Sequence, residues 1–326
     1  MKPTGEQSTD DRPLRSLLLG LAVGDALGVP YEFGPRPARR QDPCTDMVGY
    51  RTHNQPPGTW SDDTSMALVL TEQLSAAAPL EAVASGFARW LFEAEWTPGG
   101  EVFDYGGATA NALADFAQGG NPRTSGGTGE ASNGNGSLMR TAPLAWFVRE
   151  LPPEQRRIRS FEISAITHAH PRSLLACWFC VEVCVALLAG KAPAGAVDES
   201  WDEIAFWVES NPDFALDWKY YARCRSSLAR RPVQEISSSG YVVHTLEAAL
   251  WCLLTSSNYR ETVLRAVNLG EDTDTTGAVA GAFSGLVYGE AQIPKEWLAA
   301  LARRDDIVRL STLAGEGGRR RGGGTG

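Results

Sequence analysis

The sequence predicts an all-α protein that folds as a single compact domain of many helices. Apolar residues recur with helical spacing along most of the 326 residues, whereas alternating, β-branched runs typical of strands are nearly absent. Loops rich in Gly, Pro, Asn and Ser separate the helical segments, but none has the composition of a domain linker. We therefore expect one domain over 13–314, with a flexible N-terminus (1–12) and a flexible Gly/Arg tail (315–326).

The apolar-periodic segments are expected to form twelve helices, which begin and end close to the following residues: 13–28, 62–78, 80–94, 106–117, 137–149, 160–169, 172–190, 199–209, 217–227, 242–256, 259–268 and 275–288. The longer connections between them cover 34–60, 97–106, 118–136 and 228–241.

Two of these helices have unusual sequences. The first carries Gly20, Gly24 and Gly28 on one face, and glycine costs a helix about 1 kcal/mol per position. Such spacing favours the close approach of another backbone, either for packing or to leave room for a site. The helix at 172–190 is apolar enough to raise the question of a membrane span, but Glu182 in its middle favours a buried core helix.

Composition excludes several classes of protein. With 39 acidic and 30 basic side chains the net charge is −9, which disfavours extended nucleic-acid binding and an anionic membrane surface. The six cysteines are sparse, and no secretory signal pattern is found near the start, so we expect reduced thiols and a cytoplasmic location. We also expect a monomer. Cys177, Cys180 and Cys184 share one helical face and lack metal-site spacing, which predicts buried small hydrophobic residues.

Several catalytic templates do not fit. The chain has no G-x-S-x-G elbow, no P-loop and no HExxH pair. What remains is carboxylate chemistry in two turns, GTWSDDT (58–64) and GEDTDTTG (270–277), each directly before a helix. Helix capping explains one such turn. Two turns with more oxygen atoms than capping needs favour a site for a hard cation such as Mg²⁺ or Mn²⁺.

Two rival interpretations of the second turn fail on spacing. As an EF-hand loop beginning at Asp272 it would place Phe283 where a bidentate Glu is needed. As the nucleophile motif of haloacid-dehalogenase-like phosphatases it should follow a buried strand, but the preceding residues, 263–267, have helical spacing.

Six blocks, in order, resemble the ADP-ribosylglycohydrolase family, which includes dinitrogenase-reductase-activating glycohydrolase and the ADP-ribosyl-acceptor hydrolases. They are GLAVGDALGVPYEF (20–33), GTWSDDTSMAL (58–68), FDYGGAT (103–109), NGNGSLMR (133–140), THAHP (167–171) and GEDTDTTGAVAGA (270–282). The resemblance covers most of the chain, and six blocks in the family's order are highly specific. It implies an all-α fold with a two-metal Mg²⁺ or Mn²⁺ centre at the base of a cleft.

Site residues follow from the resemblance, position by position. It implies metal ligands at Ser61, Asp62, Asp63, Asp272, Asp274 and Thr275; Ser61 stands where many relatives have Thr, and keeps the hydroxyl. Glu32 matches the glutamate above the metals and the reacting ribose, and Asp104 an acid that assists ring opening or proton transfer. Asp25 is expected to support the structure. The implied substrate contacts are Gly106, Gly107, Ser132, Asn133, Gly134, Asn135 and His168.

The implied reaction is metal-dependent hydrolysis of the C1″ glycosidic bond between ADP-ribose and an acceptor, with Glu32, Asp62, Asp63, Asp104 and Asp274 as the catalytic set. The partner would be an ADP-ribosylated protein or a small ADP-ribose conjugate. Arginine, serine, O-acetyl-ADP-ribose and nucleic-acid acceptors all stay open, and an acidic rim would favour arginine. The alternative is a non-catalytic member of the same fold that binds ADP-ribose or serves as a crystallin-like structural protein. Loss of the metal ligands would indicate such a member, and here all six ligand positions keep an oxygen-bearing side chain.

Overall fold

The computed structural model describes residues 12–322, and the side chains of residues 12–315. Within this part of the chain the regular elements are helices, and the only β-pairing is two isolated bridges, Gly127 with His168 and Gly134 with Tyr241. The expected all-α class is confirmed. The predicted N-terminal segment lies outside the described residues except for Arg12.

The α-helices are α1 (Arg12–Gly28), α2 (Arg36–Gln41), α3 (Asp62–Ser75), α4 (Leu80–Glu93), α5 (Gly107–Ala117), α6 (Leu144–Val148), α7 (Pro153–Ala165), α8 (Pro171–Leu188), α9 (Pro193–Glu209), α10 (Ala215–Trp218), α11 (Val242–Thr255), α12 (Tyr259–Val267), α13 (Thr273–Tyr288), α14 (Lys295–Ala300) and α15 (Arg304–Gly322). Short 3₁₀ turns, among them η1 (Val29–Tyr31) and η2 (Glu130–Ser132), join several of them.

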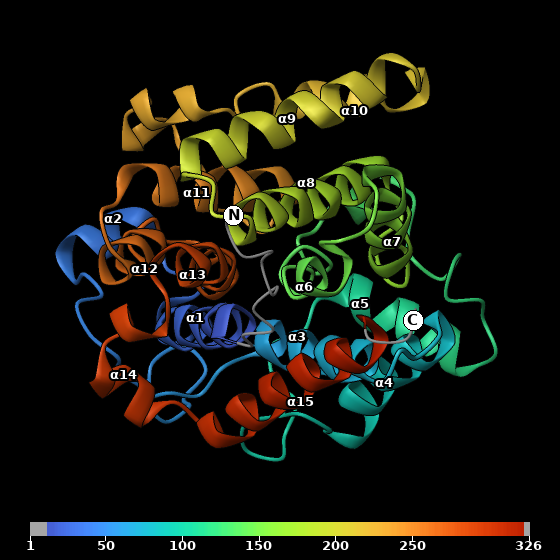
Figure 1. The fold of residues 1–326 in the computed structure, drawn as a ribbon. Helices are drawn as coiled ribbons and strands as arrows, with labels where there is room; N and C mark the ends of the chain where they lie inside the picture. Colours follow the sequence, from blue (N-terminus) through green and yellow to red (C-terminus); the bar gives the residue numbers. More distant parts are fainter. Residues whose placement is uncertain (1–11, 323–326) are drawn as a thin grey trace, which may run out of the picture.

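Helices α1 and α13 pack side by side at the centre of the fold (Figure 1). Their contact depends on glycine, because a Cβ on Gly24 would stand 2.0 Å from the carbonyl oxygen of Gly277, and one on Gly20 would stand 2.4 Å from that of Gly281. The close backbone approach predicted from the glycine spacing is confirmed. Helices α3, α4 and α15 pack on one side of this pair, and α8, α11 and α9 on the other.

Several predicted helix boundaries differ from the structure. The segment at 137–149 is helical only over α6, after a run of turns, and the segment at 217–227 is broken into α10 and 3₁₀ turns. The charged helices α2, α14 and α15 were not predicted, because they lack a broad apolar stripe. Helix α15 continues to Gly322, so the first part of the segment predicted as a flexible tail is helical; residues 323–326 lie outside the described residues.

Two segments of the described chain, Arg12–Tyr31 and Pro171–Leu188, are long and apolar enough to cross a membrane by length and composition alone. The fold buries 94% and 78% of their apolar windows. In α8, Glu182 accepts hydrogen bonds from Arg156 Nε (2.8 Å) and Trp178 Nε1 (2.9 Å), so the acid is paired within the fold. These are the surroundings of core helices. The six cysteines are free and buried, which confirms the predicted burial of Cys177, Cys180 and Cys184.

Candidate active site

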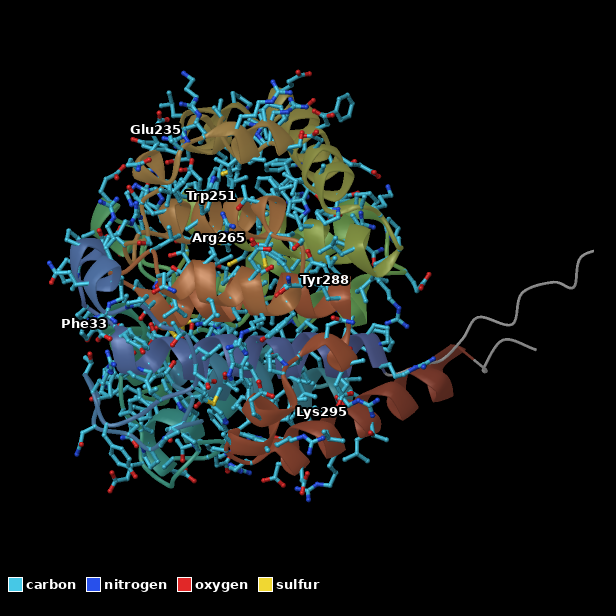
Figure 2. All side chains as sticks on the ribbon, turned by 90° about the vertical axis from the view of Figure 1, so that its left-hand side faces the viewer. Phe33, Glu235, Trp251, Arg265, Tyr288 and Lys295 are labelled. Carbon is cyan, nitrogen blue, oxygen red and sulfur yellow. The ribbon has the colours of Figure 1, made fainter. Side chains whose placement is uncertain are left out.

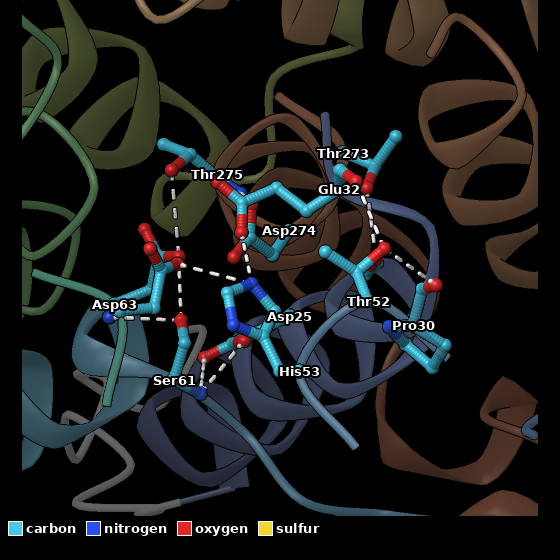
Figure 3. Close-up of polar contacts among 12 residues, drawn as sticks. Asp25, Pro30, Glu32, Thr52, His53, Ser61, Asp63, Thr273, Asp274 and Thr275 are labelled. Atoms are coloured by element: carbon cyan, nitrogen blue, oxygen red, sulfur yellow. Dashed lines mark hydrogen bonds and ion pairs between the residues drawn. The ribbon is translucent and has the colours of Figure 1, made fainter. Parts of the chain in front are cut away.

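The two carboxylate turns meet although more than 200 residues of chain separate them (Figure 3). Ser61 is the N-cap of α3 and Asp272 the N-cap of α13, so both turns present acids at helix N-termini, where the helix dipole favours negative charge. Thr275 Oγ1 donates a hydrogen bond to Asp63 Oδ2 at 3.4 Å, which joins the two turns directly.

Asp25 anchors the start of α3 from inside the core. Its carboxylate accepts hydrogen bonds from Ser61 N (2.9 Å), Thr64 N (3.0 Å) and Thr64 Oγ1 (2.6 Å), and its side chain is fully buried. Burial raises the pKa of Asp25 to about 6, against the opposing effect of these hydrogen bonds. Because both of its oxygens are already used, Asp25 positions the turn, in agreement with the structural role expected from the sequence.

Three other carboxylates keep an oxygen that is buried without a hydrogen-bond partner: Asp63 Oδ1, Asp272 Oδ1 and Asp274 Oδ2. A buried unsatisfied oxygen is costly, so these atoms mark a place for a missing partner. One oxygen each of Glu32, Asp272 and Asp274 lie within 4.8 Å of one another. One oxygen each of Asp63 and Asp274 also lie within 4.8 Å of each other and of an oxygen of Asp25, which is already held by its hydrogen bonds to the start of α3. Converging oxygens of this kind form the donor set that Mg²⁺ and Mn²⁺ prefer.

The close packing of these carboxylates also changes their pKa values. Burial, reinforced by neighbouring carboxylates, raises the pKa of Asp62, Asp63 and Asp274 well above the usual range. Without a cation, the cluster therefore binds protons where an isolated aspartate would be ionised. A dication would supply opposite charge, because no side chain of residues 12–315 forms an ion pair with these three acids.

Glu32 follows η1 and forms a second acidic group with Asp104 and His53. His53 Nε2 contacts Glu32 Oε2 directly and lies 4.0 Å from Asp104 Oδ2. Burial and the charges of Asp104 and Asp272 raise the pKa of Glu32 to about 10. The His53 ring also packs against Phe33 and Phe103, with centroids 5.9 and 5.4 Å away.

His53 was missed by the sequence analysis. The available signal was weak: it is the single histidine of the long loop at 34–60, which leads directly into the first carboxylate turn. Phe33 was also not assigned a role. It lies at the edge of the molecule (Figure 2), with 69% of its surface exposed beside the buried Glu32.

A cleft of about 360 Å³ opens over these acids. Of the residues predicted from the sequence, it is lined by Glu32, Asp62, Asp104, Gly106, Gly107, Gly134, Asn135, His168, Asp272 and Thr275. Ser61, Asp63 and Asp274 are buried close to it but do not line it. Phe33, Tyr105, Thr109 and Met139 also line the cleft and were not predicted.

Ser132 and Asn133 are not among the lining residues. Ser132 packs against Gly127, where an added Cβ would stand 2.4 Å from Ser132 Oγ, and Asn133 Nδ2 donates to the carbonyl of Glu130 at 2.9 Å. Their contact with a substrate stays a prediction. Asn135, by contrast, donates from Nδ2 to Asp272 Oδ2 at 2.9 Å and ties this loop to the start of α13.

The glycines at the start of α5 face open space. A Cβ on Gly107 would meet nothing within 4 Å, and one on Gly106 would only reach Thr109 Oγ1 at 4.0 Å. Internal packing therefore does not require glycine here. Because Gly106 and Gly107 have no side chain and lie at a helix N-terminus beside the cleft, an anionic group can approach their backbone amides closely.

A larger cavity of about 740 Å³ lies between the ends of α1, α13 and α14. Its one acid, Glu290, is already paired with Arg15 at 2.8 Å, and no carboxylate cluster lines it. The smaller cleft, which combines converging acids with polar walls, is therefore the candidate active site.

Comparison with known proteins agrees with this site. A family model described as ADP-ribosylglycohydrolase matches residues 6–322. The chain is 34% identical over 299 residues to ADP-ribosylarginine hydrolase Tri1 of Serratia proteamaculans, covering 91% of this chain and 77% of that protein. It is 29% identical over 318 residues to the ADP-ribosyl-dinitrogen reductase glycohydrolase of Rhodospirillum rubrum, covering 94% and 98%. A solved structure described as an ADP-ribosylglycohydrolase-related protein complex superposes with a TM-score of 0.74 at 30% identity, covering 94% of this chain and 98% of that chain.

Proposed function

Because the chain belongs to the ADP-ribosylglycohydrolase family, we propose that it hydrolyses the C1″ glycosidic bond between ADP-ribose and an acceptor side chain, with arginine as the preferred acceptor. One observation carries this proposal: the turns at 58–64 and 270–277 converge under a cleft and leave three buried carboxylate oxygens without partners. A purely structural member of the family would have no need to retain this costly arrangement.

We propose that two Mg²⁺ or Mn²⁺ ions complete the site. The unpartnered oxygens of Asp63, Asp272 and Asp274 fit such ions, and the donors would be Ser61, Asp62, Asp63, Asp272, Asp274 and Thr275. When bound, dications of this kind lower the pKa of a coordinated water and stabilise negative charge on oxygen.

Glu32 and Asp104 are the proposed proton-transfer groups. Both line the cleft, and the raised pKa of Glu32 means that this carboxyl holds a proton in the ion-free site. A protonated carboxyl can donate to the departing nitrogen of the acceptor, and the carboxylate that results can accept a proton from the attacking water. The transition state would resemble an oxocarbenium ion, and the products would be free ADP-ribose and the restored side chain.

The mouth of the cleft favours a guanidinium acceptor. Glu32 and Asp104 offer carboxyl oxygens that can accept hydrogen bonds, and Phe33 and Tyr105 are exposed aromatic rings at the same opening. Carboxylates and aromatic faces together recognise arginine, through charged hydrogen bonds and stacking. The free, buried cysteines suit the cytoplasmic location that we propose, with the protein acting as a monomer on an ADP-ribosylated protein.

The test is a hydrolysis assay with ADP-ribosyl-arginine and ADP-ribosyl-serine peptides, in Mg²⁺, in Mn²⁺ and in EDTA. We expect release of ADP-ribose that depends on the metal and is faster from arginine. Asp274→Asn should abolish the activity, whereas Asp305→Asn, an exposed acid in the first turn of α15, should not affect it. Equal rates in EDTA and Mg²⁺, or full activity of Asp274→Asn, would contradict the two-metal site. Binding of ADP-ribose without hydrolysis of either peptide would favour the non-catalytic alternative.

A further inference from the structure

His168 presents one ring nitrogen to the cleft. The side chain is 98% buried but belongs to the cleft wall, and its Nε2 faces the loop at 134–136. A Cβ on Gly136 would stand 3.4 Å from Nε2, and one on Gly134 would stand 3.6 Å from it. Within residues 12–315 no group forms a hydrogen bond with Nε2, so this atom is available to a ligand.

The other ring nitrogen is engaged by a chain of two buried residues. Arg140 Nη2 donates to Thr167 Oγ1 at 2.7 Å, and Thr167 Oγ1 lies 2.8 Å from His168 Nδ1. Arginine has only donors, so the threonine oxygen must accept from it. Within residues 12–315, His168 Nδ1 is then the one hydrogen-bond acceptor for the hydroxyl proton of Thr167. The opposite direction would leave that proton buried without a partner.

The positive charge of Arg140 also favours a neutral His168 ring. This guanidinium is fully buried, stacks over the ring of Phe87 at 4.6 Å and donates to the carbonyl of Gly136 at 2.7 Å, yet it forms no ion pair within the described side chains. Burial lowers the pKa of Arg140 to about 10, and the electrostatic effects of Cys177 and Asp62 oppose this only in part, so the buried cation is costly and packing alone does not account for it. Burial and the positive charge of Arg140 lower the pKa of His168 to about 3, which keeps the imidazole neutral.

We propose that Arg140 and Thr167 are positioning residues that hold His168 as the Nε2–H tautomer, so that Nε2 donates a hydrogen bond to an oxygen of ADP-ribose bound in the cleft. The proposal rests on the proposed function for the identity of the ligand. Thr109 Oγ1 also lines the cleft and is buried without a partner; it would stand 3.0 Å from a Cβ on Gly136, the same position from which His168 Nε2 would be 3.4 Å away. A nitrogen donor and a hydroxyl that both border this glycine of the cleft wall suit a ribose hydroxyl, which both donates and accepts.

The tautomer can be measured without substrate, by long-range ¹H–¹⁵N NMR of the histidine-labelled protein, with His168→Gln to assign the signal. We expect the shift of a protonated Nε2 and an unprotonated Nδ1 in His168, unchanged from pH 8 to pH 5. In Thr167→Val, which keeps the shape of the side chain, the signals should shift toward a mixture of tautomers. Ser164→Ala is the matched control, because Ser164 Oγ bonds the carbonyl of His168 at 2.8 Å and does not touch the ring.

Binding supplies a second measurement. Thr167→Val should weaken the Kd for ADP-ribose and raise the KM by about threefold to tenfold, the usual range for one hydrogen bond, with a smaller change in kcat. Thr167→Ser should restore both values. A wild-type His168 protonated on Nδ1, or a Thr167→Val spectrum identical to wild type, would overturn the proposal. If the Nε2–H tautomer is found but no hydrolysis occurs, the proposed function fails and the positioning of His168 stands.

Discussion

Phe33 and Glu271 hold each other in left-handed backbone conformations, with φ angles of 61° and 62°. Phe33 N donates to the carbonyl of Glu271 at 2.7 Å, and Glu271 N donates to the carbonyl of Gly34 at 2.7 Å. A residue with a Cβ pays about 1–2 kcal/mol for this conformation. Each of the two strained residues is next to a site acid, Glu32 or Asp272, so the reciprocal hydrogen bonds fix these acids relative to each other. Strain concentrated beside a site in this way is typical of functional geometry.

Substitution at Phe33 should separate this strain from the role of the ring. Phe33→Gly and Phe33→Ala both remove the aromatic side chain, but only glycine adopts a positive φ without steric cost. We expect Phe33→Gly to be more stable than Phe33→Ala by about 1 kcal/mol in urea unfolding. Both should lose the same fraction of affinity for an ADP-ribosyl-arginine peptide. Equal stability of the two variants would show that the backbone is not strained.

The contact between α1 and α13 predicts a sharp penalty for a single methyl group. Gly24→Ala would place its Cβ 2.0 Å from Gly277 O, and neither backbone can move without displacing Asp25 or Asp274. We expect the free energy of unfolding to fall by about 3 kcal/mol or more, because a clash with backbone atoms cannot be relieved by a change of side-chain rotamer.

Gly195→Ala is the matched control for this variant. Gly195 lies in the exposed part of α9, where a Cβ meets nothing within 4 Å, so helix propensity should make the protein more stable by up to about 1 kcal/mol. Denaturant unfolding of both variants measures the difference. A Gly24→Ala protein as stable as wild type would disprove the close approach.

The glycines of α1, Gly20, Gly24 and Gly28, show most clearly what could be predicted from the sequence. Their spacing predicts a close helix contact, and the two acidic turns predict a cation site, because helix periodicity and capping are local properties. The resemblance then identified the acids that converge. Arg140 and Thr167 lie in two of the blocks that carry the resemblance, but the hydrogen bond between them depends on an approach between segments that no local pattern encodes.

Loop residues were harder to predict for the same reason. Arg36, within a loop predicted from its composition, forms α2 and donates from Nε to the carbonyl of Leu269 at 2.7 Å and from Nη1 to that of Val233 at 2.7 Å. These long-range hydrogen bonds place the loop beside the site, and with it His53. Charged side chains that satisfy distant carbonyls leave no periodic signal, so neither α2 nor the position of His53 could be inferred.

His53 is expected to orient Glu32 for proton transfer. In His53→Ala, Glu32 would lose its only described side-chain hydrogen-bond partner outside the acids, and we expect kcat to fall by about 10- to 100-fold with little change in KM, since misplacing a reacting group has effects of this size. His53→Gln, which can still donate a hydrogen bond, should recover part of the rate. His244→Ala is the control, because His244 bonds Ser239 Oγ and does not line the cleft. An unchanged kcat in His53→Ala would show that His53 does not orient Glu32 for catalysis.

Asp25 and Asp274 should respond differently to added metal. Asp25→Asn disturbs the hydrogen bonds to Ser61 and Thr64 but keeps every proposed ligand, so we expect a 10- to 100-fold rise in the Mg²⁺ concentration needed for activity, as is usual for groups that orient metal ligands. High Mg²⁺ should restore its rate, whereas Asp274→Asn should stay inactive. Titration of activity with Mg²⁺ distinguishes the two variants. An Asp25→Asn protein that no Mg²⁺ concentration rescues would contradict a purely positioning role and indicate that Asp25 itself binds the metal.

The crowded carboxylates predict opposite effects of pH with and without metal. A carboxyl whose pKa is raised on folding binds its proton more tightly in the folded state, so its stabilising contribution is complete below the unfolded pKa and is lost as pH rises through the folded value. For Asp25 the loss should run from about pH 4 to 6, and for Glu32 from about pH 4.5 to 10.

In EDTA the site should therefore lower the melting temperature progressively between pH 5.5 and pH 8.5. Mg²⁺ competes with protons for the same oxygens, so the stabilisation that it adds should grow over that range. Thermal unfolding at both pH values, with EDTA or with Mg²⁺, measures both trends, and Asp274→Asn should weaken the response to Mg²⁺ most strongly. A Mg²⁺ stabilisation that is the same at pH 5.5 and pH 8.5 would mean that the cation does not displace protons from these acids.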